Sequence, residues 1–439
     1  MSKEEERLRL KSFRIQNWKG FKDCKLELYD GLNVLVGPNS SGKTSLLEAF
    51  KFLKKALIQT ESPYLPHLEW WTYRNIVYGN DETKPIRFQL EFQLPEEHVA
   101  TYEVVFTGVG GNVKIEKEKM EIKKVVSFTK EGETLTIEHD QDFFEKNSSM
   151  LNHMTPKIKQ KRQIKVVASH LSLLLLPIIP IIEYEENEIA LLSFFLPIIP
   201  PHRVESELSM LEVSLLSPKL KSQKKPLVSY ALNNLKEFFE EILFIRHPDL
   251  VGIRQPKPHQ SGYTLSERGE NLAAILHRWF LQKGRLPDNI EQALMHLFPY
   301  LTLRPDITVD GRVFLSIQDG MYGARLDPPS IPDGFYKLLH VLTAVESKPS
   351  ILLIDELENS LHSEILEYIV EELKNANITS IVATHSPIVV DVAGLECLQL
   401  LERTPEGNKV RRVENLEEIQ RWMREKKLTP SEMWLYQLQ

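Results

Sequence analysis

Residues 32–45 read LNVLVGPNSSGKTS, a short apolar run that leads into a turn of the pattern G-x-x-x-x-G-K-[ST]. The next residues put large apolar side chains at helical spacing, which predicts an amphipathic helix packed on a sheet: Leu46, Leu47, Phe50, Leu53 and Leu57. A strand, a glycine-containing turn and a helix in this order predict a phosphate-binding loop, because the backbone can then point successive N–H groups at one anion. The alternative is a chance glycine-rich turn, which the flanking strand and helix disfavour.

Each residue of this loop has a predicted chemical role. Lys43 is expected to neutralise the β- and γ-phosphate oxygens and to take part in catalysis, while the hydroxyl of Thr44 is expected to bind Mg²⁺. The sequence therefore predicts ATP and Mg²⁺ as ligands. The residues expected to hold the nucleotide are Gly37, Asn39, Ser40, Ser41, Gly42, Lys43, Thr44 and Ser45.

A second motif lies more than three hundred residues further along the chain. Ile351–Ile354 is an apolar run followed by Asp355 and Glu356. Open α/β sheets bind their ligands at the carboxyl ends of the strands, so this run predicts a strand that carries two carboxylates to a ligand site. Asp355 is expected to hold the Mg²⁺ ion, and Glu356 to orient or deprotonate the attacking water.

His385 follows a third apolar run, Ile378–Ala383. A strand–helix–strand unit of this length would bring Asp355 and His385 to the same edge of the sheet, within reach of a γ-phosphate. A single histidine can equally be a structural residue. Its setting in Thr384-His385-Ser386-Pro387 favours the catalytic interpretation.

Composition excludes several classes of protein. The chain has 439 residues, 42% of them hydrophobic, which is typical of a folded globular protein. Its 54 Lys and Arg against 61 Asp and Glu give a net charge of −7, so contact with nucleic acid would need a local patch. Cys24 and Cys397 lie too far apart in sequence to suggest a zinc site or a disulfide framework. The charged start, Met1-Ser-Lys-Glu, is not that of a signal peptide, so a cytoplasmic protein is expected.

Shifts in composition divide the chain into four expected parts. These are an N-terminal lobe with the phosphate-binding loop and a β subdomain (1–204), a helical insertion (205–300), a C-terminal lobe (301–403) and a helical tail (404–439). In the insertion, helices are predicted at Leu232–Leu243, Asn271–Leu281 and Ile290–Leu297. Strands and helices alternate in the C-terminal lobe, which predicts parallel strands joined by crossover helices.

Two central segments keep alternative interpretations. The stretch Lys157–Lys165 is rich in basic residues and fits either a solvated loop or a nucleic-acid contact. The apolar runs 171–182 and 189–200, each with a Pro-Ile-Ile-Pro sequence, are too short to span a bilayer. They fit buried or edge strands, and a membrane-associated hairpin is the alternative.

Several further motifs occur in a recognisable order. They are Trp18-Lys19-Gly20-Phe21, Ile331-Pro332-Asp333-Gly334, Glu358-Asn359-Ser360-Leu361-His362 and the segment around His385. With the two nucleotide motifs they resemble the ABC-type ATPases of the RecF, SMC and OLD (overcoming lysogenisation defect) group. Pro200-Pro201-His202-Arg203 and Arg268-Gly269-Glu270-Asn271-Leu272 resemble landmarks of the OLD subgroup. The resemblance implies an α/β fold, an ABC-type P-loop ATPase with a mixed central sheet, an antiparallel β subdomain and an inserted helical arm.

The same resemblance implies a mechanism and partners. ATP would lie at the interface of a head-to-tail homodimer, between the loop of one subunit and the signature residues Asp333 and Gly334 of the other, with Asn359 of the D-loop also contacting nucleotide. The expected function is control of DNA-associated processing, in genome maintenance or anti-phage defence. The chain ends too soon after His385 for the Toprim nuclease domain of OLD enzymes, so a separate effector such as a nuclease is expected, and no membrane partner.

Two departures from the family pattern qualify this expectation. Pro332 stands where the family usually has the signature serine, so a hydroxyl and a backbone N–H are missing, and weaker or slower ATP-driven dimer closure is predicted. No glutamine can be assigned to the Q-loop. The alternative function is a nucleotide-dependent switch or scaffold with negligible hydrolysis, and a transporter ATPase is disfavoured by the signature region and the long insertion.

Overall fold

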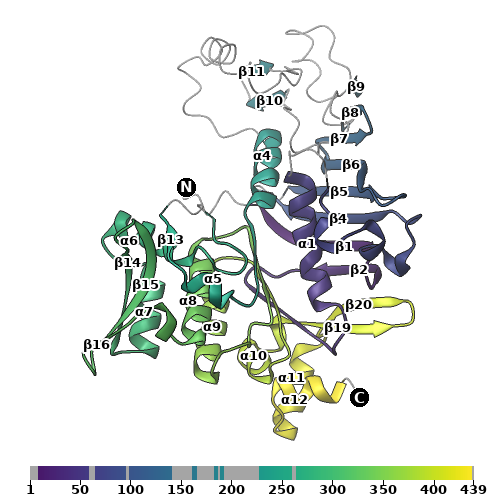
Figure 1. Ribbon diagram of the computed structural model, residues 1–439. Coiled ribbons are helices and arrows are strands. Elements are labelled where there is room, and N and C mark those ends of the chain that lie inside the picture. Colours follow the sequence, from purple (N-terminus) through teal and green to yellow (C-terminus); the bar gives the residue numbers. More distant parts are fainter. Residues whose placement is uncertain are drawn as a thin grey trace. The chain divides into compact units, whose positions relative to one another are not determined.

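The computed structural model describes residues 8–58, 65–94, 98–140, 161–165, 182–185, 188–191, 227–259 and 264–437 (Figure 1). The chain divides into two compact units. The first unit comprises residues 1–27 and 52–240, and the second comprises residues 28–51 and 241–439. The segment with the phosphate-binding loop therefore belongs with the C-terminal half of the chain. The four-part division expected at residues 204, 300 and 403 stays a prediction.

An antiparallel sheet with the strand order β2-β1-β4-β5-β6-β7-β8-β9 forms the first unit. Its strands are β1 (Arg9–Trp18), β2 (Phe21–Glu27), β4 (Ile86–Gln93), β5 (Val99–Thr107), β6 (Lys114–Ile122), β7 (Val126–Glu131), β8 (Thr134–His139) and β9 (Lys161–Lys165). Alternate residues of β4 are buried, as its period-two pattern predicts. Strands β1 and β2 form an antiparallel pair at the start of the described chain.

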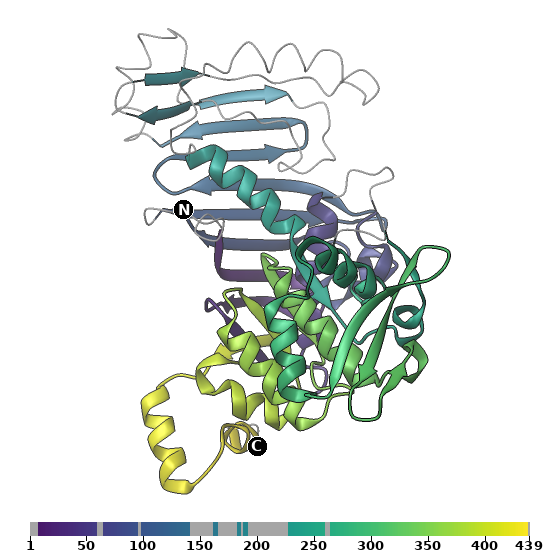
Figure 2. The same cartoon turned by 90° about the vertical axis from the view of Figure 1, so that its left-hand side faces the viewer.

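Aromatic side chains form the core of the first unit. Trp18, at the β1–β2 turn, packs against Phe52 and Phe88 with ring centroids 5.2 and 5.6 Å away. Helix α4 (Leu227–Glu240) lies against the strands (Figure 2), where Phe238 meets Phe92 at 5.0 Å. Three short 3₁₀ turns precede β4 in the chain: η1 (Leu68–Trp70), η2 (Tyr73–Asn75) and η3 (Tyr78–Asn80). A separate hairpin consists of β10 (Ile182–Glu185) and β11 (Glu188–Leu191).

The second unit contains a mixed sheet with the strand order β12-β17-β18-β3-β19-β20. Its strands are β12 (Ile242–Ile245), β17 (Ile351–Asp355), β18 (Ser380–Ala383), β3 (Leu32–Val36), β19 (Leu398–Thr404) and β20 (Gly407–Arg412). The pairings from β12 to β19 are parallel, and β20 is antiparallel to β19. Every residue of β3 and β17 is buried, as expected for parallel strands covered on both faces.

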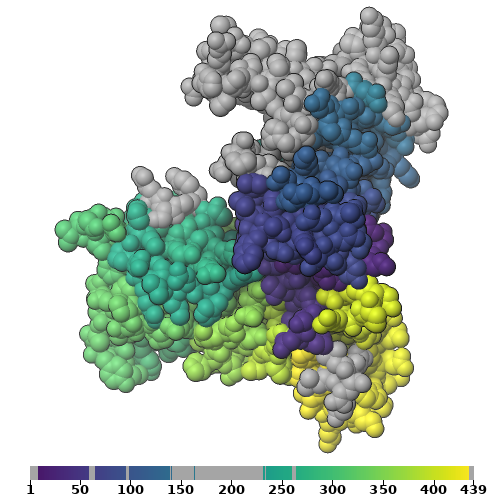
Figure 3. Space-filling model, turned by 45° about the vertical axis from the view of Figure 1, so that its right-hand side comes forward, coloured from purple at the N-terminus to yellow at the C-terminus, as the bar shows by residue number. Residues whose placement is uncertain are grey.

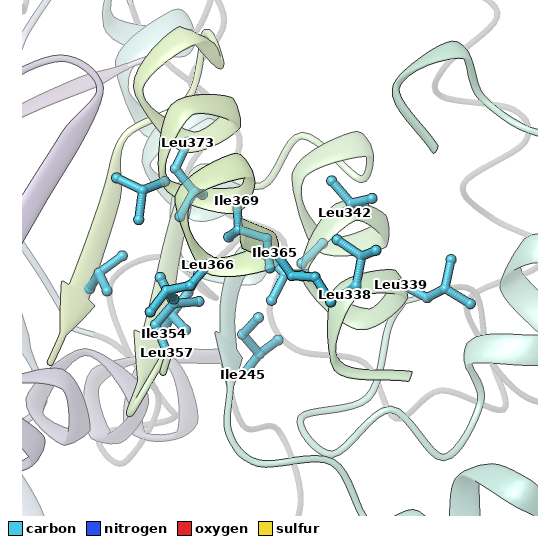
Figure 4. Close-up of a cluster of buried hydrophobic side chains, with 14 of the residues drawn as sticks. Ile245, Leu338, Leu339, Leu342, Ile354, Leu357, Ile365, Leu366, Ile369 and Leu373 are labelled. Carbon is cyan, nitrogen blue, oxygen red and sulfur yellow. The ribbon is translucent and has the colours of Figure 1, made fainter. Parts of the chain in front are cut away.

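Helices cover this sheet. They are α8 (Asp333–Glu346), α9 (Ser363–Asn375) and α10 (Pro387–Ala393), and α1 (Lys43–Ile58) follows the phosphate-binding loop after β3. Apolar side chains of α8 and α9 meet those of the strands in the cluster of Figure 4, where Ile365 faces Leu338 and Leu366 lies beside Ile354. The helix predicted after the phosphate-binding loop is confirmed by α1, and its five listed apolar residues are fully buried.

A smaller sheet and the C-terminal helices complete the second unit. The strands of this smaller sheet are β13 (Lys257–Pro258), β14 (Leu301–Ile307), β15 (Arg312–Asp319) and β16 (Ala324–Leu326). The remaining elements are α5 (Leu250–Arg254), α6 (Leu272–Lys283), α7 (Asp288–Leu297), η8 (Pro328–Ser330), η9 (Leu395–Cys397), α11 (Leu416–Lys426) and α12 (Pro430–Gln437). The space-filling view shows β19, β20 and the last helices in yellow (Figure 3).

One predicted helix is partly wrong. The pattern predicts a helix over Leu232–Leu243, but α4 ends at Glu240 and Ile242–Ile245 forms strand β12. The run ILFI is apolar on every residue, so it can be buried on both faces, and it pairs in parallel with β17. Pairing with β17 therefore determines the conformation of Ile242–Ile245, although the residues before them have helical spacing.

Some predicted features lie outside the described residues. These are Lys157–Gln160, both Pro-Ile-Ile-Pro sequences and Pro200–Arg203. Of Lys161–Lys165 the backbone is described, as strand β9. Within the part of the chain that is described, no helix is both long and apolar enough to cross a membrane.

Candidate nucleotide site

The loop between β3 and α1 has a backbone that is suited to wrap an anion. Ser40 and Gly42 have φ values of 66° and 101°, in the left-handed region. A Cβ on Gly37 would lie 2.5 Å from the carbonyl oxygen of Leu401, so no other residue fits there. Asn39 and Ser40 are exposed, whereas Ser41 is buried.

Two side chains of this loop have polar groups that a phosphate could engage. Lys43 Nζ donates to the carbonyl oxygens of Gly37 at 2.9 Å and Pro38 at 3.2 Å, so the lysine turns back onto its own loop. Burial lowers the pKa of Lys43, and the charges of Asp355, Glu358 and Glu356 oppose that fall. The hydroxyl of Ser41 is buried without a hydrogen-bond partner among the described residues. These groups fit an incoming phosphate, which would satisfy both.

Thr44 and Asp355 join the two main motifs. Thr44 Oγ1 donates to Asp355 Oδ1 at 3.2 Å, although 311 positions separate the two residues in sequence. They meet because β3 and β17 are parallel strands of one sheet with only β18 between them, so their carboxyl ends share an edge. A hydroxyl and a carboxylate oxygen are ligands that Mg²⁺ prefers, so the donor set fits this ion.

Asp355 is buried, and its charge is balanced by neighbours. Burial raises the pKa of Asp355, whereas Arg246 and the hydrogen bond from Thr44 lower it. Arg246 Nη2 forms an ion pair with Glu48 at 2.9 Å, and its Nε lies 4.0 Å from Asp355 Oδ2. Glu267, which binds Lys51 Nζ at 2.6 Å, completes this network.

Glu356 lies just past the end of strand β17, in a strained backbone conformation. Its φ of 53° is left-handed, and its backbone N–H donates to the carbonyl oxygen of Ala383 at 3.0 Å. Asn359 Nδ2 donates to Glu356 Oε2 at 2.6 Å. The residue is exposed, so its carboxylate is accessible to water. A strained, anchored carboxylate of this kind is common at functional sites.

His385 lies next to the same group of carboxylates. Its backbone N–H donates to Glu358 Oε1 at 2.7 Å, and the hydroxyl of Thr384 donates to Glu358 Oε2, also at 2.7 Å. Partial burial lowers the pKa of His385 and so does the charge of Lys43, while Glu358 and Glu356 oppose them. The imidazole is therefore favoured in its neutral form.

The residues predicted to contact a second subunit's nucleotide lie at the start of helix α8, in the second unit. Asp333 starts helix α8 after Pro332, and its carboxylate accepts a hydrogen bond from Arg254 Nη2 at 2.6 Å. A Cβ on Gly334 would lie 2.8 Å from the carbonyl oxygen of Ser360, so the D-loop packs directly against the start of α8.

The sequence did not single out two residues of the site. Arg246 directly follows the apolar run Ile242–Ile245, part of which falls in a predicted helix. A strand prediction for this run would have marked Arg246 as a residue at the carboxyl end of a strand, where ligands bind. Glu358 was interpreted only as part of the D-loop, and its spacing from Asp355 gave no sign that it would hold Thr384 and His385.

Comparison with known proteins agrees with this geometry. The model of the family described as "AAA ATPase domain" matches residues 9–246, more than half of the chain. The chain belongs to the AAA ATPase domain family. It is therefore an ATPase, with an α/β P-loop fold that contains mixed and antiparallel sheets. A second AAA domain model, whose description names the AbiEii toxin of a type IV TA system, matches residues 232–391.

Curated relatives of this AAA ATPase match it over short stretches. The DNA replication and repair protein RecF of Lactococcus lactis (strain MG1363) is 31% identical over 20% of the chain and 24% of its own length. The chromosome partition protein Smc of Desulfitobacterium hafniense is 51% identical over 10% of the chain and 4% of its own length. The chain thus spans about a quarter or less of these relatives. The matches support the RecF and SMC group of ATPases.

Solved structures are similar over most of the chain. An SMC head bound to the C-terminal winged-helix domain of ScpA covers 93% of this chain and 99% of its own, with 11% identity and a TM-score of 0.49. The SMC head domain from Thermotoga maritima covers 92% and 99%, with 12% identity and a TM-score of 0.40.

Proposed function

We propose that this ATPase binds and hydrolyses ATP with Mg²⁺ at the loop of residues 37–45 and couples that cycle to DNA-associated processing. The observation that carries the proposal is the 3.2 Å hydrogen bond between Thr44 and Asp355, because it joins the phosphate-binding loop to the carboxylates of β17. A structural turn would not need this convergence of a lysine, a hydroxyl and two carboxylates.

Each residue has a defined part in the proposed reaction. Lys43 exchanges the carbonyl oxygens of Gly37 and Pro38 for phosphate oxygens. Thr44 and Asp355 would hold Mg²⁺, which when bound supplies positive charge that neutralises the phosphates. Glu356 orients the attacking water or takes its proton. His385, with its pKa lowered, can donate or accept a hydrogen bond at the γ-phosphate.

A head-to-tail homodimer is part of the same proposal. Asp333 and Gly334 stand at the N-terminus of the long helix α8, whose dipole favours an anion, so in this proposal they meet the nucleotide of a second subunit together with Asn359. ATP would then favour the closed dimer, and hydrolysis would release it. Pro332 leaves this contact without a serine hydroxyl, which supports slow closure.

The processes and partners rest on the relatives and on the motif resemblance. The RecF and Smc proteins are named for replication, repair and chromosome partition, which supports a role on DNA. A place in the OLD-like subgroup, a role in anti-phage defence and a separate effector such as a nuclease belong to the proposal as well. So does a cytoplasmic location, whose reducing conditions suit a chain with only two cysteines, Cys24 and Cys397.

The second candidate function is a nucleotide-dependent switch that hydrolyses ATP negligibly. Pro332 favours it, because a weakened signature contact would slow assembly of the complete site. The exposed Glu356 beside an intact loop favours hydrolysis.

Steady-state turnover decides between the two functions. Glu356→Gln should lower kcat at least about a hundredfold and keep ATP binding, since only the carboxylate that acts on water is lost. Lys43→Ala should weaken ATP binding at least about tenfold. Glu364→Gln, an exposed carboxylate in the first turn of α9, is the matched control. Equal turnover in wild type and Glu356→Gln would reject the hydrolytic function.

A further inference from the structure

Arg254, the last residue of helix α5, holds the segment that leads into helix α8. Its Nη2 donates to the carbonyl oxygen of Ile331 at 3.0 Å and to Asp333 Oδ1 at 2.6 Å. Pro332 makes no side-chain hydrogen bond at the N-cap of α8, and Gly334 has no side chain. The two hydrogen bonds from Arg254 therefore anchor this segment through a single side chain.

Helix α5 gives Arg254 a fixed backbone. The helix is capped by Asp249, whose carboxylate accepts two backbone hydrogen bonds of 3.1 Å from the first turn. Ile253, just before Arg254, is buried in the core cluster that also contains Ile331. The arginine and the segment that it holds are thus both anchored in the same apolar core.

An aromatic ring of α8 supports the guanidinium group. The central carbon of the Arg254 guanidinium lies 5.6 Å from the centre of the Tyr336 ring. Tyr336 is itself fixed, because its hydroxyl donates to the carbonyl oxygen of Pro328 at 3.2 Å. The Arg254 side chain is 28% exposed, whereas that of Asp333 is 50% exposed. The pair therefore presents the carboxylate, with its positive partner behind it, at the surface beside the start of α8.

The charge of Asp333 needs a partner if a phosphate is to approach. The free N–H groups and the dipole at the start of a helix attract an anion. Asp333 is the first residue of α8 and adds a negative charge at the same place, which would repel a triphosphate. The guanidinium of Arg254 offsets that charge. Because the pair is partly exposed, it contributes little to folding, and its main effect is on what binds beside it.

We propose that Arg254 is a positioning residue, which fixes Ile331 and neutralises Asp333 so that the start of α8 can receive the γ-phosphate held by a second subunit. The inference rests on the ATP-bound homodimer of the proposed function. It assigns a part in that dimer to helix α5, which carries none of the nucleotide motifs.

Arg254→Met tests this role in the Glu356→Gln chain, which is expected to retain bound ATP. With Mg²⁺ and ATP, the Kd of the dimer measured by analytical ultracentrifugation should rise at least about tenfold, because a bare carboxylate then faces the phosphate. Arg254→Lys keeps the positive charge and should restore part of the affinity. Arg14→Met is the matched control: Arg14 also pairs with an aspartate, Asp23, at 2.6 Å, but in the first unit, and its loss should leave the Kd unchanged.

A double-mutant cycle isolates the charge of Asp333. Asp333→Asn removes the negative charge, so it should tighten the dimer of the Arg254→Met chain at least about threefold. In the chain that keeps Arg254, the same change should tighten the dimer less, because the guanidinium already offsets the carboxylate. Equal effects of Asp333→Asn in the two chains would overturn the inference, and so would a double variant that dimerises more weakly than Arg254→Met.

Two further measurements separate this role from folding and from nucleotide binding. Urea unfolding without ATP should differ little between Arg254→Met and its parent chain, since the ion pair is partly exposed. Titration with a fluorescent nucleotide should give a Kd for the nucleotide within about twofold of the parent value, because the loop at 37–45 is unchanged. A loss of nucleotide binding as large as the loss of the dimer would contradict the assignment.

The two proposals fail in different ways. If the Glu356→Gln chain does not dimerise with Mg²⁺ and ATP, the homodimer of the proposed function is wrong, and the role of Arg254 fails with it. If that chain dimerises and Arg254→Met dimerises equally well, only the role of Arg254 is wrong. Should Arg254→Met not fold, Arg254→Gln, which is shorter and uncharged, takes its place, and an unchanged Kd of the dimer in that variant rejects the inference.

Discussion

Gly37 shows how strongly one backbone position constrains the site. A methyl group there would lie 2.5 Å from a main-chain oxygen of β19, which cannot move without distorting the sheet. We expect Gly37→Ala to raise the Kd for ATP at least about tenfold, because strain of this kind costs about 1–3 kcal/mol. Gly110→Ala, where a Cβ meets nothing within 4 Å, should leave the Kd unchanged when both are measured by fluorescent-nucleotide titration.

His340 predicts a specific dependence of stability on pH. It is fully buried, its Nε2 lies 3.2 Å from the carbonyl oxygen of Ser266, and burial lowers its pKa to about 3. The unfolded chain binds a proton below about pH 6.5 and the folded chain does not, so stability is present above that pH and is lost as the pH falls toward 3. Between about pH 7.5 and pH 5 the contribution lost is about 2 kcal/mol.

Urea unfolding at these two pH values checks the effect. His340→Gln should remove most of the difference, whereas His362→Gln, at an exposed histidine, should retain it. A pH dependence that is identical in wild type and His340→Gln would contradict the assignment.

Individual site residues were predictable to different degrees. Lys43, Thr44, Asp355 and Glu356 belong to local patterns, so their neighbourhood in space follows from strand order. Glu358 and Arg246 act through contacts between separate segments, and a side chain's tertiary partners are not encoded in its local pattern.

At the scale of the element, the start of helix α8 makes a prediction of its own. Pro332 occupies the N-cap position without a side-chain hydrogen bond, where serine would supply a hydroxyl. In a Glu356→Gln background, Pro332→Ser should tighten the ATP-dependent dimer about tenfold, the value of one hydrogen bond to a charged group. Analytical ultracentrifugation with and without ATP measures this.

Pro332→Ala is the control for that experiment. It restores the backbone N–H but adds no hydroxyl, so it separates the two losses. If serine and alanine have equal effects, the hydroxyl has no role; if neither alters the dimer, the start of α8 does not contact nucleotide.

Elements with a clear period were predicted well. The alternating pattern of β4 and the apolar face of α1 both match the structure. Strand β12 was not predicted. It has only four residues, lies just after a helix, and takes its conformation from pairing with β17. A run of that length has no periodicity by which to distinguish strand from helix.

At the scale of the whole molecule, nucleotide binding should stabilise the second unit. Mg²⁺ and ATP together should raise the Tm of the Glu356→Gln chain. At an ATP concentration a hundredfold above Kd, the free energy of unfolding should increase by about 2.7 kcal/mol. Lys43→Ala should show no such rise, and EDTA should diminish it in the parent chain. An equal rise in Lys43→Ala would place the nucleotide elsewhere.

The interleaved order of the two units has a consequence for biosynthesis. Strand β3 leaves the ribosome early, yet its neighbours β18 and β19 are made more than three hundred residues later. The first unit can close around its own strands in the meantime, while β3 waits with both edges unpaired and open to non-native pairing. A nascent chain of this protein therefore assembles the sheet around β3 only after β17, β18 and β19 have been made, and termination before them yields a polypeptide without that sheet.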